Sequence, residues 1–254
     1  MLKRSLLFIL AILVLAACAA QIPETTPTPE PEPTMAILPS PTIDWFPSTP
    51  TPTRVATEVG TIPTPIAEVP VSWPLMVTDD FSDQSHWQES SGATGTVAYE
   101  TNALSLALPA GKAPLVSISD HILPGEFYLE LTFDTLMCSD EDQYGLILWR
   151  NSTSGTFRIW FNCRGEVMVD RQLNASIGRL LNWQKARKLQ PGAPANNRIA
   201  VWAEDGQLRV FANGIEQFSL QTHSDLSGAL GVVAQGSGSN AATFSISNLV
   251  IYAP

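Results

Sequence analysis

Basic side chains are scarce in this chain. Lys and Arg number 14 against 24 Asp and Glu, so the 254 residues carry a formal net charge of −10 at pH 7. A chain this acidic is a poor candidate for binding nucleic acid or anionic lipid surfaces, because both carry the same sign of charge. Neutral ligands such as glycans are compatible with it, and we expect no nucleic-acid partner.

Histidine and cysteine are also scarce, with three of each. His86, His121 and His223 are widely separated, and no Ser or Cys motif accompanies them. Because a hydroxyl or thiol nucleophile needs an adjacent base, we expect ordinary surface histidines and assign no catalytic residue. Neither the third cysteine, Cys18, nor a neighbouring His joins Cys138 and Cys163 in a metal-ligand pattern, so we assign no metal and no cofactor.

Residues 1–18 have the pattern of a signal peptide. Two basic residues precede the apolar run from Leu6 to Leu15, which is shorter than the ~20 residues that span a bilayer. The ending Leu15-Ala16-Ala17-Cys18 resembles the bacterial lipobox, whose cysteine is diacylated and becomes the first residue of the mature chain. This implies an extracytoplasmic protein, lipid-anchored to the bacterial cell membrane at Cys18. Ordinary cleavage within the small-residue run is the alternative.

Residues 19–75 have a composition that does not support a folded domain. They hold fourteen of the chain's twenty prolines. Proline fixes φ and removes backbone donors, and the intervening Thr and Glu bury little surface. At ~3.1 Å per residue, such a disordered Pro/Thr-rich linker would hold a domain up to ~170 Å from the membrane.

Residues 76–254 are long enough for one core and too short for two comfortable domains. Within them, the stretch 144–171 alternates with period two between turn residues. Phe157, Ile159 and Phe161 share one strand face, and Arg158 and Trp160 share the other. We predict an antiparallel meander with one apolar face and one mixed face.

Short strands fill almost the whole domain. Asp205-Gly206 and Asn213-Gly214 between alternating runs predict hairpins, and only Ile177–Leu189 could hold a helical turn. Many short strands separated by turn residues predict an all-β antiparallel β-sandwich. Outside the meander, the expected strands are 96–101, 103–108, 115–119, 126–136, 198–203, 207–212, 216–220, 228–234 and 243–252.

Cys138 and Cys163 remain after the leader, in a compartment that permits a disulfide. The hairpin brings Cys163 near Cys138 if the acidic loop 139–143 curls back, giving the ~4.4–6.8 Å Cα separation that a bridge requires. We predict this disulfide. The alternative is two unpaired, buried thiols.

Several short motifs recur in a fixed order between residues 78 and 252. They are Asp80-Phe81-Ser82 with Trp87, Tyr144-Gly145-Leu146, Arg150, Gly165, Trp183, Pro191-Gly192, Asn197-Arg198-Ile199, Leu208 through Asn213-Gly214, Gly228-Ala229-Leu230-Gly231, and Phe244 before Asn248-Leu249-Val250. This order resembles the concanavalin A-like lectin/glucanase superfamily, in particular laminin G-like jelly rolls on bacterial surface lipoproteins. The resemblance implies two curved antiparallel sheets, with any ligand on the concave face or at the sheet rim.

The glucanases of that superfamily use a Glu-x-Asp-x-x-Glu strand, which this chain does not match. The acidic run Asp140-Glu141-Asp142 falls in a loop and has no following Glu at the right spacing. Glu130 and Asp134 share a strand face but lie about 13 Å apart, beyond the ~5–9.5 Å that glycoside hydrolysis requires. We therefore predict that the protein is not an enzyme.

Calcium is common in laminin G-like domains. Asp79, Asp80 and Asp83 could supply oxygen ligands. The C-terminal strand, however, offers Ser247 and Asn248 where related domains often have Asp. Solvated acidic turns are the preferred interpretation.

The mixed face is the better candidate for a binding site. Aromatic rings pack against sugar C–H groups, and polar side chains bind hydroxyls. The alternative is that these aromatic rings cover the sheet beneath a loop such as 179–197, or stand singly in solvent. By strand parity, the candidates are Tyr128, Trp149, Arg158, Trp160, Trp202, Arg209 and Phe211.

The sequence thus predicts a membrane-anchored lipoprotein whose jelly roll binds an extracellular glycan without catalysis. One alternative is a structural or protein-interaction module of the cell envelope, with an envelope protein as partner. The second is a glycoside-active enzyme with an unrecognised site.

The lipid anchor can be tested by Cys18→Ala. Two acyl chains, at ~0.8 kcal/mol per buried CH₂, give a lasting anchor that this variant cannot acquire. We expect it to leave the membrane fraction, measured by fractionation and immunoblotting. A variant that stays with the membranes would contradict the prediction.

Overall fold

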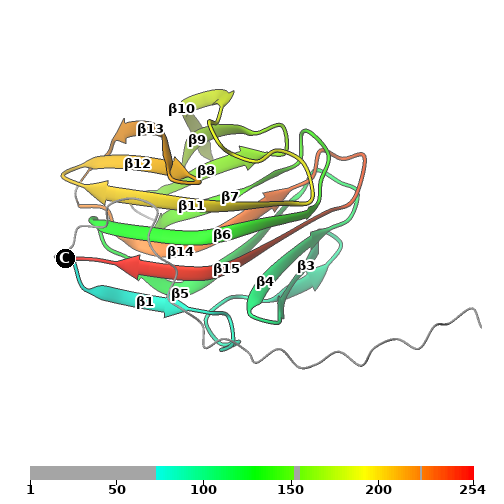
Figure 1. Ribbon diagram of the computed structural model, residues 1–254, viewed down its shortest axis with the longest axis horizontal. Helices are drawn as coiled ribbons and strands as arrows, with labels where there is room; N and C mark the ends of the chain where they lie inside the picture. Colours follow the sequence, from blue (N-terminus) through cyan, green and yellow to red (C-terminus); the bar gives the residue numbers. More distant parts are fainter. Residues whose placement is uncertain (1–72, 152–154, 224) are drawn as a thin grey trace, which may run out of the picture. The chain divides into compact units, whose positions relative to one another are not determined.

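The computed structural model describes residues 73–151, 155–223 and 225–254, which form two antiparallel β-sheets stacked in layers (Figure 1). The larger sheet has the order β13-β12-β11-β6-β15-β4-β3-β2, with β1 also paired to β15. Its strands are β1 (Leu75–Asp79), β2 (Ser90–Gly92), β3 (Gly95–Glu100), β4 (Ala103–Leu108), β6 (Phe127–Met137), β11 (Ala195–Glu204), β12 (Gln207–Ala212), β13 (Ile215–Gln221) and β15 (Ala242–Tyr252).

The smaller sheet has six strands in the order β10-β9-β8-β7-β14-β5. They are β5 (Pro114–Leu123), β7 (Gln143–Asn151), β8 (Gly155–Asn162), β9 (Glu166–Leu173), β10 (Ser176–Lys185) and β14 (Gly228–Gln235). The predicted all-β sandwich is confirmed. No helix in the described ranges is long and apolar enough to cross a membrane.

The core lies between the two sheets. Phe157, Ile159 and Phe161 point into it, as the alternation predicts, and meet side chains of the nine-stranded sheet such as Leu129 and Val201. Each of these side chains is at most 3% exposed. Burying one contributes roughly 1.5–3 kcal/mol relative to leaving it in water, so the inner faces fix which side chains of each strand point outward.

The two hairpin signals are confirmed. Asp205 and Gly206 join β11 to β12, and Asn213 and Gly214 join β12 to β13, all with positive φ. This is the backbone conformation of type I′ turns, which Asp, Asn and Gly tolerate.

The segment Ile177–Leu189, which we considered able to hold a helical turn, mostly forms the strand β10 instead. It pairs antiparallel with the outer edge of β9, and the register shifts between Leu181 and Gln184. Leu181 therefore packs against the main core, whereas Trp183 packs on the outer face of the six-stranded sheet. Pairing with β10 gives hydrogen-bond partners to the backbone N–H and C=O groups along the edge of β9, which would face solvent if this segment were a helix.

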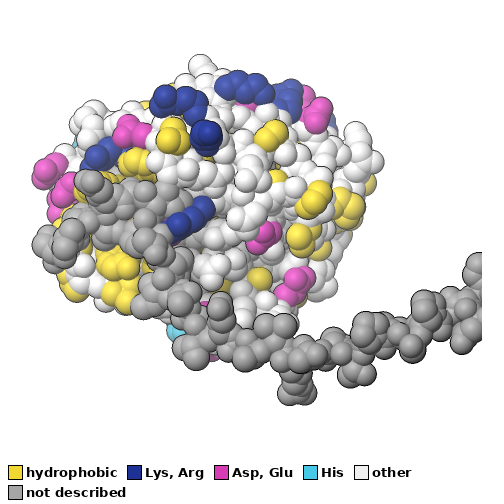
Figure 2. Space-filling model, viewed as in Figure 1, with side chains coloured by type: hydrophobic (Ala, Val, Ile, Leu, Met, Phe, Trp, Pro, Cys, Tyr) yellow, Lys and Arg dark blue, Asp and Glu magenta, His cyan; other side chains and the backbone are white. Residues whose placement is uncertain are grey.

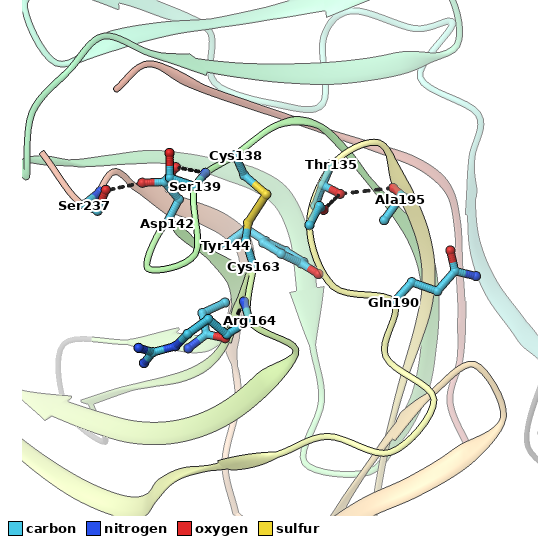
Figure 3. The surroundings of a disulfide bond; sticks show 12 residues. Thr135, Cys138, Ser139, Asp142, Tyr144, Cys163, Arg164, Gln190, Ala195 and Ser237 are labelled. Carbon is cyan, nitrogen blue, oxygen red and sulfur yellow. Dashed lines mark hydrogen bonds between the residues drawn. A yellow bond between two sulfur atoms is a disulfide. The ribbon is translucent and has the colours of Figure 1, made fainter. Parts of the chain in front are cut away.

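The disulfide between Cys138 and Cys163 is present, with a Cα–Cα distance of 6.4 Å (Figure 3). Asp142, which is fully buried, makes the acidic loop curl back. Its carboxylate accepts the backbone N–H groups of Ser139 at 2.5 Å and Ser237 at 2.6 Å. The Asp142 carbonyl also accepts the Cys163 N–H at 3.1 Å, which holds the two cysteines together.

Reduction of this bridge should lower the melting temperature. A loop closed over 25 residues contributes about 3 kcal/mol in the chain-entropy model, or roughly 6–12 °C for a domain of this size. Differential scanning fluorimetry with and without reductant measures the change. Two free thiols in denatured, unreduced protein would contradict the bridge.

Candidate functional site

The seven predicted ligand-face residues do not share one surface. Arg158 and Trp160 lie on the outer face of the six-stranded sheet. Tyr128, Trp202, Arg209 and Phe211 lie on the outer face of the nine-stranded sheet. The alternation of side chains along a strand separates inward from outward positions, but it does not say which sheet the strand joins. The prediction that the seven residues share one face is therefore wrong.

Trp149 lies in the main core, which corrects its predicted place on an outer face. It is fully buried, with its ring centroid 5.5 Å from those of both Phe127 and Phe157. Its Nε1–H donates to the Pro124 carbonyl at 2.7 Å. A φ of 50° and a register shift between Leu148 and Asn151 mark a bulge, which reverses the alternation at this position.

The aromatic residues of the nine-stranded sheet are engaged in packing. Buried Tyr128 donates its hydroxyl to Glu130 at 2.6 Å, and Arg198 also pairs with this carboxylate. The Arg209 guanidinium lies 3.9 Å from the centroid of the Trp202 ring, and the Trp73 ring stands edge-on to Trp202 at 6.5 Å. In Figure 2, which views this sheet, much of the visible surface is neither charged nor hydrophobic.

The outer face of the six-stranded sheet carries a second apolar cluster. Trp160 packs there with Ile118, Ile147, Met168 and Val233, all nearly buried. Its Nε1–H has no hydrogen-bond partner among the described residues.

Beside this cluster, Arg158 donates Nε to Asp170 at 2.6 Å, and its guanidinium lies 5.5 Å from the Trp160 ring centroid. Asp170 is only 3% exposed. An ion pair this buried fixes the direction of the guanidinium, because separating the two groups would leave an uncompensated charge.

A pocket of about 370 Å³ opens next to Arg158. One part of its lining is polar and the other is aliphatic, which is the combination that presents hydrogen bonds to hydroxyl groups and an apolar surface to C–H groups. The polar residues are Arg150, Thr156, Arg158, Gln172 and Asn174; the others are Pro114, Val116, Ile147, Gly155 and Val233.

Sequence reasoning missed most of these pocket residues. Strand pairing brings Thr156 opposite Gln172 and Arg158 opposite Asp170. The turn at Arg164-Gly165 gives this register, so Gln172 could have been found by counting back from the hairpin. Arg150 comes from β7 after the bulge, where parity fails.

The carboxylates on the outer face of β9 are Glu166 and Asp170. They are four residues apart, or about 13 Å in an extended strand, beyond the separation for glycoside hydrolysis. A hydrogen bond from Asn162, with the nearby Arg164 and Lys185 charges, holds the pKa of Glu166 below its usual value, although partial burial opposes this. The lowered pKa of Glu166 is the opposite of the raised pKa that a general acid needs.

The residues expected near calcium take part in local turns. Asp79 accepts the Trp87 indole N–H at 2.8 Å and the Phe81 N–H at 2.7 Å. Burial acts to raise the pKa of Asp79, but hydrogen bonds with His121, Trp87 and Phe81 outweigh burial and lower it. Asp80 and Asp83 accept backbone N–H groups two residues ahead.

The expectation of scattered histidines is wrong for two of the three. The rings of His86 and His121 lie with their centroids 5.0 Å apart. Asp120 lies beside both, and its hydrogen bond to His86 raises the pKa of that imidazole.

The two stacked sheets and their strand order define a concanavalin A-like jelly roll. No protein-family model and no curated protein matches the chain. Among solved structures, a carbohydrate-binding module, CBM66, from Bacillus subtilis matches with a TM-score of 0.53 at 11% identity, over 66% of this chain and 96% of its own.

Two further structures have the same fold. A Bacillus licheniformis beta-glucanase matches with a TM-score of 0.54 at 11% identity, over 70% of this chain and 97% of its own. A Bacillus subtilis protein of unknown function with a galectin-like fold matches with a TM-score of 0.56 at 9% identity, over 71% and 97%. The predicted fold is therefore confirmed, and it is shared by binding modules and enzymes alike.

Proposed function

We propose that this protein is a non-catalytic glycan-binding lipoprotein, and that the pocket on the outer face of the six-stranded sheet is its binding site. The observation that carries the proposal is the lining of that pocket, where five polar side chains face an aliphatic wall. A sugar ring has hydroxyl groups at its rim and C–H groups on its faces, so both parts of the lining have a counterpart.

The chemistry of the pocket favours binding over hydrolysis. Asp170, the acidic side chain next to the pocket, already pairs with Arg158. A glycosidase needs one carboxylic acid to protonate the leaving group and a second carboxylate to attack or activate water. The spacing of Glu166 and Asp170 does not supply this pair.

The anchor and linker complete the proposal. A lipid on Cys18 would hold the protein at the outer side of the bacterial cell membrane, and residues 19–75 would extend the domain toward extracellular glycans. Those 57 residues lie outside the described ranges, apart from 73–75.

The site can be tested on an oligosaccharide array with the full chain. We expect Arg150→Ala/Gln172→Ala to weaken binding of the best oligosaccharide 10-fold or more, because each lost hydrogen bond to a sugar costs roughly 1 kcal/mol and one to a charged group more. Both side chains are partly or fully exposed, so the fold should survive. Calorimetric titration measures the affinity.

Arg209→Ala/Gln207→Ala is the matched control. It removes the same residue types from the outer face of the nine-stranded sheet, and we expect unchanged affinity. Loss of binding in the control alone would move the site to that sheet. A silent array with capture of an envelope protein, or release of reducing sugar ends, would refute the proposal in favour of an interaction module or an enzyme.

A further inference from the structure

Two histidines and an aspartate converge outside the pocket, at the edge of the six-stranded sheet. Asp120 and His121 lie on β5, and His86 lies in the segment between β1 and β2. One ligand atom from each of the three residues can be chosen so that all lie within 4.8 Å of one another.

The two imidazoles direct the same nitrogen toward Asp120. His86 Nδ1 lies 3.1 Å from Asp120 Oδ2, and His121 Nδ1 lies 3.4 Å from Asp120 Oδ1. The Nδ1 atoms of His86 and His121 and the carboxylate of Asp120 therefore converge at the surface.

The opposite nitrogen of each ring faces another carboxylate. His121 Nε2 lies 3.4 Å from Asp79 Oδ2, and His86 Nε2 lies 3.6 Å from Asp83 Oδ2. Metal-binding histidines usually donate their second ring N–H to such a group, which fixes the ring and makes the ligand nitrogen more basic. His121 has this arrangement with Asp79, and Asp83 lies within ion-pair distance of His86.

The backbone holds the two segments in place. The Asp120 N–H donates to the His86 carbonyl at 3.0 Å, and Gln88 N–H donates to the Ile118 carbonyl at 3.1 Å. Asp79 is buried and also holds the Trp87 indole, so its position beside His121 is fixed by the core. The ligands thus come from a preformed framework.

We propose that His86, His121 and Asp120 bind a zinc ion, with Asp79 and Asp83 orienting the two imidazoles and water in the fourth position. Tetrahedral zinc with bonds of ~2.0–2.2 Å places its ligand atoms about 3.4 Å apart. Closing from the observed spacing needs a small movement, which exposed Asp120 and half-exposed His86 allow.

The donor set selects zinc over calcium. Imidazole nitrogen suits zinc, whereas calcium takes six to eight oxygen ligands. Within 4 Å of the two rings, the charged partners in the described chain are Asp79, Asp83 and Asp120, so the local field attracts a cation. A bound ion would fasten the segment after β1 to edge strand β5.

Calorimetric titration of chelator-stripped full chain with zinc chloride tests the site. We expect one zinc per chain, and a rise in melting temperature of about 5–10 °C at a hundredfold excess over the dissociation constant. His86→Gln should weaken zinc binding at least 10-fold. Asp83→Asn, which changes only an orienting group, should weaken it by 10- to 100-fold.

His223→Gln is the matched control, because His223 is exposed and is absent from the cluster. We expect unchanged zinc affinity in this variant. The far-UV circular dichroism of His86→Gln should match that of the parent chain, since its side chain is at the surface. Zinc binding that survives His86→Gln, calcium binding that displaces zinc, or no binding at all would overturn the proposal.

Discussion

The packing of the two inner sheet faces against each other is the interaction on which the rest of the structure depends. A strand has two faces, and the core takes one of them completely: Phe157, Ile159 and Phe161 are buried against the opposite sheet. Their neighbours Arg158 and Trp160 must then point outward. The ion pair of Arg158 with Asp170, and the pocket beside it, follow from this alternation rather than from any local binding motif.

Local pattern explains how much of the fold could be predicted. The period-two alternation gave the strands and their inward faces, and the Asp-Gly and Asn-Gly turns gave two hairpins, because both are properties of neighbouring residues. The disulfide was predictable because a short acidic loop joins its first cysteine to the paired strands. β10 was missed because its conformation is set by a partner strand, which outweighs the weak helical preference of the segment.

The candidate site was predicted only in part, for physical reasons. Parity placed Trp202 and Trp160 on outward faces, but the assignment of each strand to a sheet is a long-range property. Parity failed at Trp149, where a bulge with positive φ turns a bulky ring into the core. The pairing of His86 with His121 depends on the contact between Trp87 and Ser119, which has no sequence signal.

The fold alone does not decide between binding and catalysis, because a carbohydrate-binding module and a glucanase share it. Our proposal of binding rests on the residues of the six-stranded face: polar side chains line the pocket, and Asp170, next to it, is paired with Arg158. Within a chain of formal charge −10, Arg150 and Arg158 supply positively charged hydrogen-bond donors to this pocket.

Amide hydrogen exchange, with and without a bound oligosaccharide, tests this account most directly because it reports each sheet separately. Our account predicts added protection in peptides covering β8 and β9, together with the end of β7, and unchanged exchange in β11 to β13. Protection confined to the nine-stranded sheet would contradict the central claim that the ligand binds on the outer face of the six-stranded sheet.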